Sequence, residues 1–122
     1  MSSIQRFAPP LPMPFSQDVK AGGFVFLSGQ LPMDGQGNIV GDDVQAQTRL
    51  VLERIAATLA TAGARMADVV RVNVWLVDLG DFPAFNEEYR RHFSEAFPAR
   101  STVQAGLYRG ARVEIEVQAW VG

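Results

Sequence analysis

The stretch Arg112–Val121 alternates strictly between apolar and polar side chains, and this pattern constrains the fold more than any other. A repeat of two residues predicts a β-strand with one buried face. The apolar face holds Val113, Ile115, Val117, Ala119 and Val121, and the opposite face holds Arg112, Glu114, Glu116, Gln118 and Trp120. Its two carboxylates, with an arginine before the preceding strand, are compatible with binding of a small anion and activation of water. A solvated outer face is the other interpretation.

The remaining periodicities predict further strands and two helices. Runs rich in β-branched and aromatic residues predict strands, and apolar residues at helical spacing predict helices. The expected strands are Phe15–Lys20, Phe24–Leu27, Val69–Val77, Thr102–Leu107 and Arg112–Val121. Ala21-Gly22-Gly23 is expected to form a tight turn between the first two strands. One face of the strand 69–77 is expected to hold Val70, Val72, Val74 and Leu76, and the other face Val69, Arg71, Asn73, Trp75 and Val77. The expected helices are Val44–Ala62, which Asp42 or Asp43 can cap, and a second one that Asp81 caps and Phe97-Pro98 terminates. The proline-rich segment 1–14 is expected to be extended and can add a short edge strand.

The resulting order, β-β-α-β-α-β-β, predicts an α+β domain with a mixed sheet and both helices on one face. Two helices are too few to cover both faces of so wide a sheet. The other face must then meet solvent or another subunit. It carries Trp75 and Trp120 among charged side chains, and aromatic side chains are enriched at interfaces. We therefore expect a partner subunit on that face.

Composition excludes several classes of protein. The 122 residues suffice for a real core, and we expect a single domain over residues 1–122. The net charge of −2 argues against a nucleic-acid partner, which requires a basic surface. The absence of cysteine excludes disulfides, zinc–thiolate sites and a thiol nucleophile. We find no signal peptide and no apolar stretch of membrane-spanning length, so we expect a cytoplasmic protein.

Some conspicuous residues also have a purely structural interpretation. Gly29, at a strand end, indicates either a close approach of the backbone to another group or a bulge. The only histidine, His92, is interpreted as a surface residue. The polar face of the first helix is expected to be solvated, and it comprises Gln45, Gln47, Arg49, Glu53 and Arg54. The aromatic stripe of the second helix is expected to be core rather than a ligand site, and it comprises Phe82, Phe85, Tyr89 and Phe93.

Several segments of the chain together resemble the RidA (YjgF-type) family. They are Phe26–Pro32 (FLSGQLP), Asp78–Phe82 (DLGDF) with Asn86 and Tyr89, Phe97–Ser101 (FPARS) and Val113–Glu116 (VEIE). The resemblance extends over nearly the whole chain, in order and at compatible spacing. Taken together these motifs are specific, although any one of them alone is weak.

The resemblance implies a chorismate-mutase-like fold of the bacillus type and a homotrimer. In the family, the sheets build a central barrel, the helices lie outside, and the active sites lie in clefts between subunits. The resemblance also implies hydrolysis of reactive enamines and imines, such as 2-aminoacrylate and 2-iminobutanoate, to 2-keto acids and ammonia. Family deaminases use no cofactor or metal, so the implied partners are small imino or keto acids and further copies of the chain.

The same resemblance implies roles for individual residues. Arg100 matches the arginine that binds the substrate carboxylate, and a guanidinium can donate two parallel hydrogen bonds to such a group. Glu114 matches the glutamate that orients the attacking water and draws off its proton. Gly29 and Thr102 match positions whose backbone N–H groups contact the substrate. These groups could anchor the carboxylate or stabilise charge that develops at the reacting carbon.

The pocket is expected to include further residues, and the chain departs from the family at some of them. Ser28 and Asn86 are expected to contact the substrate, as is Phe15, which stands where many relatives have a tyrosine. Thr102 stands where many relatives have a cysteine, and Tyr108 replaces a usual proline in a turn that looks one residue shorter. These departures leave the arginine clamp intact and bear on the side chain of the preferred substrate.

Two further expectations concern geometry and function. Arg100 and Glu114 are expected on neighbouring strands of one hairpin, with the rest of each pocket supplied by the next chain, and Glu116 is expected to be structural inside the barrel. The alternative functions are a non-catalytic, keto-acid-binding or regulatory trimer and a pathway-specific enamine deaminase. An RNA-cleaving protein conflicts with the acidic charge, and a chorismate mutase would need more cationic groups for a dicarboxylate.

Overall fold

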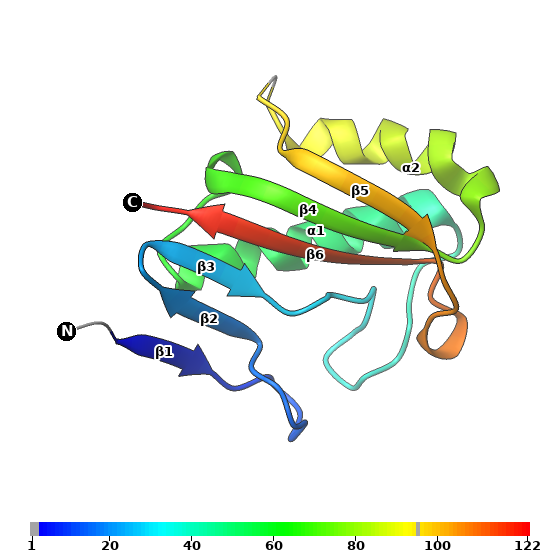
Figure 1. The fold of residues 1–122 in the computed structure, drawn as a ribbon. Coiled ribbons are helices and arrows are strands. Elements are labelled where there is room, and N and C mark those ends of the chain that lie inside the picture. The colour runs from blue at the N-terminus through cyan, green and yellow to red at the C-terminus, as the bar shows by residue number, and fades with distance from the viewer. Residues whose placement is uncertain (1–2, 95) are drawn as a thin grey trace.

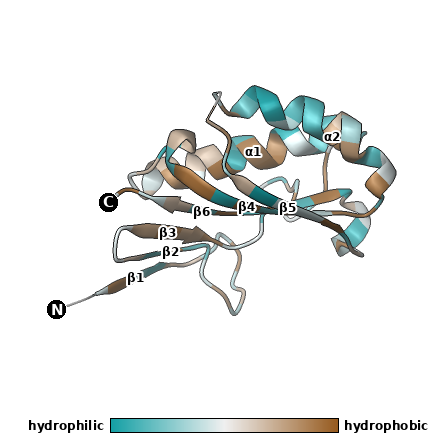
Figure 2. Cartoon of the chain, turned by 45° about the horizontal axis from the view of Figure 1, so that its top comes forward, coloured by the Kyte–Doolittle hydropathy of each residue, from teal (hydrophilic) through white to brown (hydrophobic). Residues whose placement is uncertain are grey.

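The computed structural model describes residues 3–94 and 96–122 as a helix layer on one mixed sheet. The elements are β1 (Ile4–Phe7), β2 (Asp18–Ala21), β3 (Phe24–Leu27), α1 (Val44–Thr61), β4 (Val69–Leu76), α2 (Phe82–Tyr89), β5 (Ala99–Gln104) and β6 (Val113–Trp120). The strand order is β1-β2-β3-β6-β4-β5, and both helices lie on the same face (Figure 1; Figure 2). The predicted α+β class is confirmed, and the proline-rich arm does add the edge strand β1.

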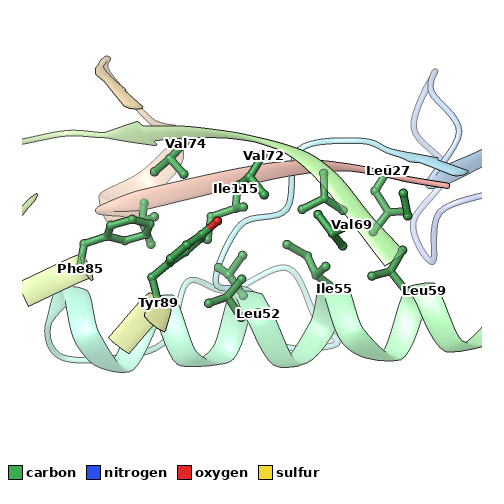
Figure 3. Packing of buried hydrophobic residues seen from close by; sticks show 14 of the residues in the cluster. Leu27, Leu52, Ile55, Leu59, Val69, Val72, Val74, Phe85, Tyr89 and Ile115 are labelled. Atoms are coloured by element: carbon green, nitrogen blue, oxygen red, sulfur yellow. The ribbon is translucent and has the colours of Figure 1, made fainter. Parts of the chain in front are cut away.

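The core lies between the sheet and the helices (Figure 3). The central strand β6 buries the side chains that the alternation predicts, namely Val113, Ile115, Val117 and Ala119. From the other side, α1 packs a stripe of fully buried residues against them, namely Val51, Leu52, Ile55 and Leu59. Val121 lies beyond β6 and is 43% exposed, so the predicted apolar face ends at Ala119. In the described part of the chain, neither helix has the length and apolar character that crossing a membrane requires.

The β2–β3 hairpin has the predicted tight turn. Ala21 pairs with Phe24, which leaves Gly22 and Gly23 as the two central residues, with φ of 58° and 86°. Positive φ at both central positions favours glycine and matches the right-handed twist of the flanking strands. The predicted strand Phe15–Lys20 is shorter in the structure, because β2 begins only at Asp18. Phe15 therefore lies outside the sheet.

The predicted hairpin between the last two strands is wrong. β4 lies between β5 and β6, pairing in parallel with β5 and antiparallel with β6. Trp75 of β4 thus has Val103 on one side and Glu114 on the other. The reason is that α2 connects β4 to β5, and a helical crossover returns the chain parallel to the strand that it left. β5 also starts earlier than Thr102, so Arg100 lies inside the strand.

The alternation in β4 is broken at its start. Val72, Val74 and Leu76 are buried as predicted, but Val69 is 6% exposed and Val70 is 46% exposed, which reverses the predicted faces of these two residues. The pairing with β6 shifts register between Val69 and Arg71. An extra residue at such a shift exchanges the two faces of a strand.

The predicted solvated face of α1 is wrong at Gln47, which is 2% exposed. Its amide donates a hydrogen bond to the Gly41 carbonyl (3.2 Å) and accepts one from the Arg112 N–H (2.7 Å). The helix start is otherwise as predicted, since the Asp43 carboxylate accepts from the Ala46 N–H at 2.8 Å. Gln47 thereby ties the loop before α1 to the residue that precedes β6, close to Glu114.

The second helix differs from its prediction at both ends. The Asp81 side chain makes no capping hydrogen bond, and its carboxylate instead lies 3.7 Å from the guanidinium of Arg112. The helix ends at Tyr89, after which Arg90–His92 form a short 3-10 turn. Pro98 therefore does not end the helix, and it instead directly precedes β5, which begins at Ala99.

Candidate functional site

Arg100 lies on the helix-covered face of the sheet. In the parallel β4–β5 pair it stands beside Val72, whose side chain is buried in the core, and paired residues of adjacent strands share a face. Its guanidinium carbon lies 4.7 Å from the centre of the Tyr89 ring, 5.3 Å from that of Phe85 and 5.5 Å from that of Phe82. These distances are typical of cation–π contacts. Three rings of α2 thus form an aromatic cage around Arg100.

The prediction that the aromatic stripe of α2 belongs to the core is therefore only partly correct. Phe85 and Tyr89 are buried as predicted (Figure 3), whereas Phe82 is 39% exposed. Burial raises the pKa of Tyr89 to about 12, while the Arg100 charge acts in the opposite direction. Tyr89 is consequently neutral at physiological pH. A neutral ring can hold the arginine without cancelling its charge.

A pocket of about 300 Å³ opens beside Arg100, lined by Asn86, Tyr89, Arg90, Phe97, Pro98 and Arg100. Asn86 and Arg100, which the sequence assigned to substrate binding, therefore lie together. Among the residues that the structure describes, none of the ion pairs involves Arg100. Its charge can accordingly serve a bound anion.

Thr102 belongs to the same half of the site. It stands beside Val74, so its side chain is on the same face as that of Arg100. The Ala105 N–H donates to the Leu76 carbonyl of β4 at 3.0 Å, and successive N–H groups of a strand point to alternate edges. The Thr102 N–H, three residues earlier, therefore points to the outer edge of the sheet. A backbone N–H that points to this outer edge is not used by the sheet and can donate to a ligand.

Glu114 lies on the opposite, uncovered face. It stands across from Trp75 in the β4–β6 pair and two residues from Glu116. Burial raises the pKa of the Glu114 carboxyl, and the charge of Glu116 raises it further. Glu116 itself accepts a hydrogen bond from the Asn73 amide at 2.9 Å. The chain thus holds a carboxyl of increased basicity on the uncovered face.

Gly29 packs directly against this carboxyl. A side chain at position 29 would overlap Oε2 of Glu114 and come within 3.1 Å of its carboxyl carbon. Of the two predicted explanations for this glycine, the structure therefore supports close approach. The next residue, Gln30, exchanges backbone hydrogen bonds with Ile115 of β6 at 2.7 and 3.1 Å. This bridge fixes Gly29 beside Glu114.

The neighbours of Gly29 are also held in place. The Ser28 hydroxyl donates to the Ser16 carbonyl at 2.6 Å, which ties the end of β3 to the segment before β2. Phe15 belongs to that segment and is 50% exposed. Phe15 and Gly29 both line a second cleft, of about 730 Å³. Ser28, Gly29, Phe15 and Glu114 thus form one neighbourhood.

The predicted site residues consequently fall into two half-sites, which one chain does not bring together. The arginine half-site consists of Asn86, Arg100 and Thr102 on the helix-covered face. The carboxyl half-site consists of Phe15, Ser28, Gly29 and Glu114 on the other side. The aromatic cage was missed by sequence reasoning, although an aromatic stripe shortly before Arg100 could have indicated it.

The uncovered face carries exposed aromatic side chains at one end. Phe24 pairs with Trp120, and the Phe24 and Phe26 rings stack with centroids 5.8 Å apart. Trp120 is 52% exposed, and β3 is apolar along its length (Figure 2). A surface of this kind is typical of a protein interface.

Other polar clusters lie outside both half-sites. His92 is less exposed than predicted, and its Nε2 lies 2.7 Å from the buried carboxylate of Glu88. Arg49 and Arg91 lie 3.6 and 3.4 Å from the same carboxylate. This cluster joins the two helices. In the part of the chain described, no group of three or more His, Cys, Asp or Glu residues is placed to hold a metal ion.

Comparison with known sequences gives one family. The sequence model described as Endoribonuclease L-PSP matches residues 6–121. A RutC family protein of Pyrococcus horikoshii is 45% identical over 109 residues, which span 88% of this chain and 86% of the archaeal protein. TdcF of Escherichia coli K12, named provisionally as a reactive intermediate deaminase, is 40% identical over 110 residues, spanning 87% and 85% of the two chains.

Solved structures share the fold. The crystal structure of Escherichia coli TdcF with bound serine matches with a TM-score of 0.86 and 39% identity, over 94% of each chain. That of RidA from an Antarctic Psychrobacter bacterium matches with a TM-score of 0.88 and 36% identity, over 96% of this chain and 99% of the other.

Proposed function

We propose that this chain, which belongs to the endoribonuclease L-PSP family that includes the RidA and YjgF proteins, hydrolyses reactive 2-imino and enamine acids to 2-keto acids and ammonia. The name of its relative TdcF supports a deaminase. The observation that carries the proposal is the aromatic cage around Arg100. It holds a guanidinium beside a small pocket, as recognition of a small carboxylate requires.

Arg100 binds the substrate carboxylate in this proposal. Its guanidinium donates parallel hydrogen bonds to the two carboxylate oxygens, which fixes a planar imino acid in position and orientation. The Thr102 N–H, at the outer edge of β5, is a further donor to the same ligand. Asn86 lines the pocket and supplies amide hydrogen bonds. Each bond to a charged group is worth about 1.5–3 kcal/mol.

Glu114 acts on water. Its raised pKa makes the carboxylate a stronger base than an ordinary glutamate. The substrate reacts as the protonated imine, and as the water oxygen attacks its carbon Glu114 accepts one water proton, giving a neutral carbinolamine. Glu114 then returns this proton to the nitrogen, the C–N bond breaks as ammonia leaves, and the hydroxyl proton passes back to Glu114, which leaves the keto acid. Since a protonated Glu114 cannot accept the proton, the rate should fall as the pH drops through its pKa.

In this proposal each active site combines the arginine half-site of one subunit with the carboxyl half-site of its neighbour. Within one chain they lie on opposite sides of the sheet, so a second copy must supply the missing half. The exposed aromatic surface of Phe24, Phe26 and Trp120 supports such an assembly. The family resemblance favours a homotrimer with three sites between subunits.

The test is an imine-trapping assay. An L-amino acid oxidase converts 2-aminobutyrate to 2-iminobutanoate, and semicarbazide traps the imine as a coloured adduct. We expect micromolar protein to reduce the adduct strongly, and Arg100→Ala to remove this effect while the oligomer persists. Arg65→Ala is the matched control, because Arg65 is an exposed arginine paired with Asp68 and should retain full activity.

Two results would argue against the proposal. Undiminished adduct in the presence of the parent protein would exclude general imine hydrolysis. Full activity of Arg100→Ala would show that the carboxylate binds elsewhere.

A non-catalytic, keto-acid-binding protein is the second candidate, and the serine-bound structure of TdcF favours it, since it shows that relative with a small amino acid. Calorimetric binding of 2-oxobutanoate without loss of trapped imine would support this alternative. A pathway-specific enamine deaminase would act on one dedicated enamine rather than on 2-iminobutanoate. The family name implies RNA cleavage, which the net charge of −2 disfavours. The cytoplasmic location stays a prediction.

A further inference from the structure

The carboxyl half-site shares Phe15 and Gly29 with a second cleft, which the small substrates above do not need. This cleft, of about 730 Å³, is walled by the segment Pro9–Phe15, the loop Leu31–Asn38, Leu50 of α1 and the turn at Tyr108. Gly29 belongs to its wall, and Gly29 packs against Glu114. The proline-rich segment follows the carboxyl end of β1 and the second loop follows the carboxyl end of β3, so both lie at the same end of these strands (Figure 1). A substrate whose reacting carbon lies beside Glu114 can therefore extend into the cleft.

Large apolar side chains line this cleft from two sides. Leu11, Met13 and Phe15 come from the segment before β2 and are 44%, 53% and 50% exposed. Opposite them, the loop contributes Leu31 and Met33. Exposure of so many large apolar side chains around one hollow is typical of a ligand site.

Two of the three charged residues of the wall, Asp34 and Arg54, are held by backbone groups, and the guanidinium of the third, Arg109, lies 5.1 Å from the centre of the Tyr108 ring. Arg54 donates to the Met33 carbonyl at 2.7 Å and to the Leu31 carbonyl at 3.4 Å. The Asp34 carboxylate accepts from the N–H groups of Gln36 and Asn38 at 2.8 and 3.0 Å. These bonds shape the loop and leave its apolar side chains as the contact surface. The prediction that Arg54 belongs to a solvated face is accordingly wrong.

The cleft is also preformed. Four prolines restrict the backbone of the segment 9–14, and Met33 pairs with Ile39 across the base of the loop. Ordered walls lower the entropic cost of binding. A hollow of this volume is in the range that accommodates ligands larger than a three- or four-carbon acid.

We propose that the preferred substrates are imino acids with a bulky apolar side chain, branched aliphatic or aromatic, which lies in this cleft. The inference rests on the proposed deaminase function. The imino acid made from leucine has two more carbons than 2-iminobutanoate. Burial of each additional methylene strengthens binding about four-fold, so the expected preference is roughly ten-fold or more.

The test compares kcat/KM for imino acids that an L-amino acid oxidase makes from 2-aminobutyrate, leucine and phenylalanine. We expect kcat/KM to be at least about ten-fold higher for the leucine or phenylalanine product than for 2-iminobutanoate. No activity on any of the three would contradict the proposed function. Activity with equal or higher kcat/KM for 2-iminobutanoate would overturn the substrate inference alone.

A substitution in the cleft wall tests whether the substrate preference arises in the cleft. Met13→Glu places a charge on the apolar wall at an exposed position, where folding should tolerate it. The ratio of kcat/KM for the leucine-derived imine to that for 2-iminobutanoate should fall about ten-fold. Leu79→Glu is the control, since Leu79 is 46% exposed and lies outside the cleft, and it should keep the parent ratio. An unchanged ratio in Met13→Glu would overturn the inference.

Discussion

Asp18 carries a carboxyl that the fold buries almost without polar support. Asp18 is 2% exposed. The Gln17 amide nitrogen, which donates to the Asp18 carboxylate, lies at the long distance of 3.5 Å from its Oδ1. Burial raises the pKa of Asp18 above its ordinary value of 3.8, while Gln17 and Lys20 act in the opposite direction. The folded chain therefore binds this proton more tightly than the unfolded chain. Its contribution to stability is complete below pH 3.8 and is lost as the pH rises through the folded pKa.

Asp18→Asn should consequently stabilise the protein at neutral pH. The amide cannot ionise, so the variant avoids a buried charge that costs about 1–3 kcal/mol. The gain in unfolding free energy, measured by urea denaturation at pH 7, should shrink as the pH approaches 4. Glu53→Gln, at an exposed position of α1, should show a gain below about 0.5 kcal/mol at either pH. A variant that is less stable than the parent at pH 7 would contradict the assignment.

Candidate site residues were easier to choose from the sequence than to place in the fold. The motifs singled out Arg100 and Glu114, and their chemical types are appropriate for a carboxylate ligand and for water. Their faces depend on the register of β5 and β6 against β4, which is set by pairing between residues far apart in the chain. The sequence placed the start of β5 at Thr102, so the face of Arg100 could not be predicted.

Among the elements, α2 has a function that its periodicity did not reveal. The same aromatic spacing that seals the core also surrounds Arg100. Tyr89→Leu should remove the closest ring and weaken binding of 2-oxobutanoate about ten-fold, because a partly buried cation–π contact is worth about 1–2 kcal/mol. Isothermal titration calorimetry measures this loss.

Phe93→Leu is the matched control for the loss of packing. The Phe93 ring contacts that of Tyr89 at 4.8 Å but is not one of the rings around Arg100. This variant should lower the unfolding temperature while keeping the affinity, and Tyr89→Phe, which retains the ring, should restore binding. Equal affinities of Tyr89→Leu and the parent protein would exclude a positioning role.

Local sequence patterns predicted the helices and strands well, and contacts between residues far apart in the chain explain the predictions that failed. The alternation in β6, the stripe of α1 and the Gly22-Gly23 turn are local, and each is confirmed. The register shift at Val69 and the burial of Gln47 arise from contacts with β6 and with the residue before it. The chorismate-mutase-like fold followed from the family resemblance, which the structural matches confirm.

For the whole molecule, the separation of the half-sites predicts complementation between inactive variants. Arg100→Ala and Glu114→Ala should each be inactive alone. Refolded together in equal amounts, they should form mixed oligomers in which about a quarter of the sites combine an intact Arg100 with an intact Glu114 from the neighbouring subunit. The recovered activity is measured by imine trapping.

A mixture of Arg100→Ala and Asn86→Ala is the control, because both changes affect the arginine half-site. No assembly of these two chains contains an intact half-site of that kind, so the mixture should show no more activity than the two variants measured separately. Failure of the first mixture, with mixed oligomers detected by native mass spectrometry, would contradict a site shared between subunits.

The position of β6 has a consequence for how the chain acquires its structure. This strand is the last of the eight elements in chain order, yet it pairs with both β3 and β4 at the centre of the sheet. While the ribosome is still making β5, the earlier strands therefore lack the neighbour that joins them. Folding must wait until β6 has been synthesised, and it then depends on pairing such as that of Phe24 with Trp120. Such distant contacts slow folding, so the nascent chain should depend on chaperones that shield its apolar strands.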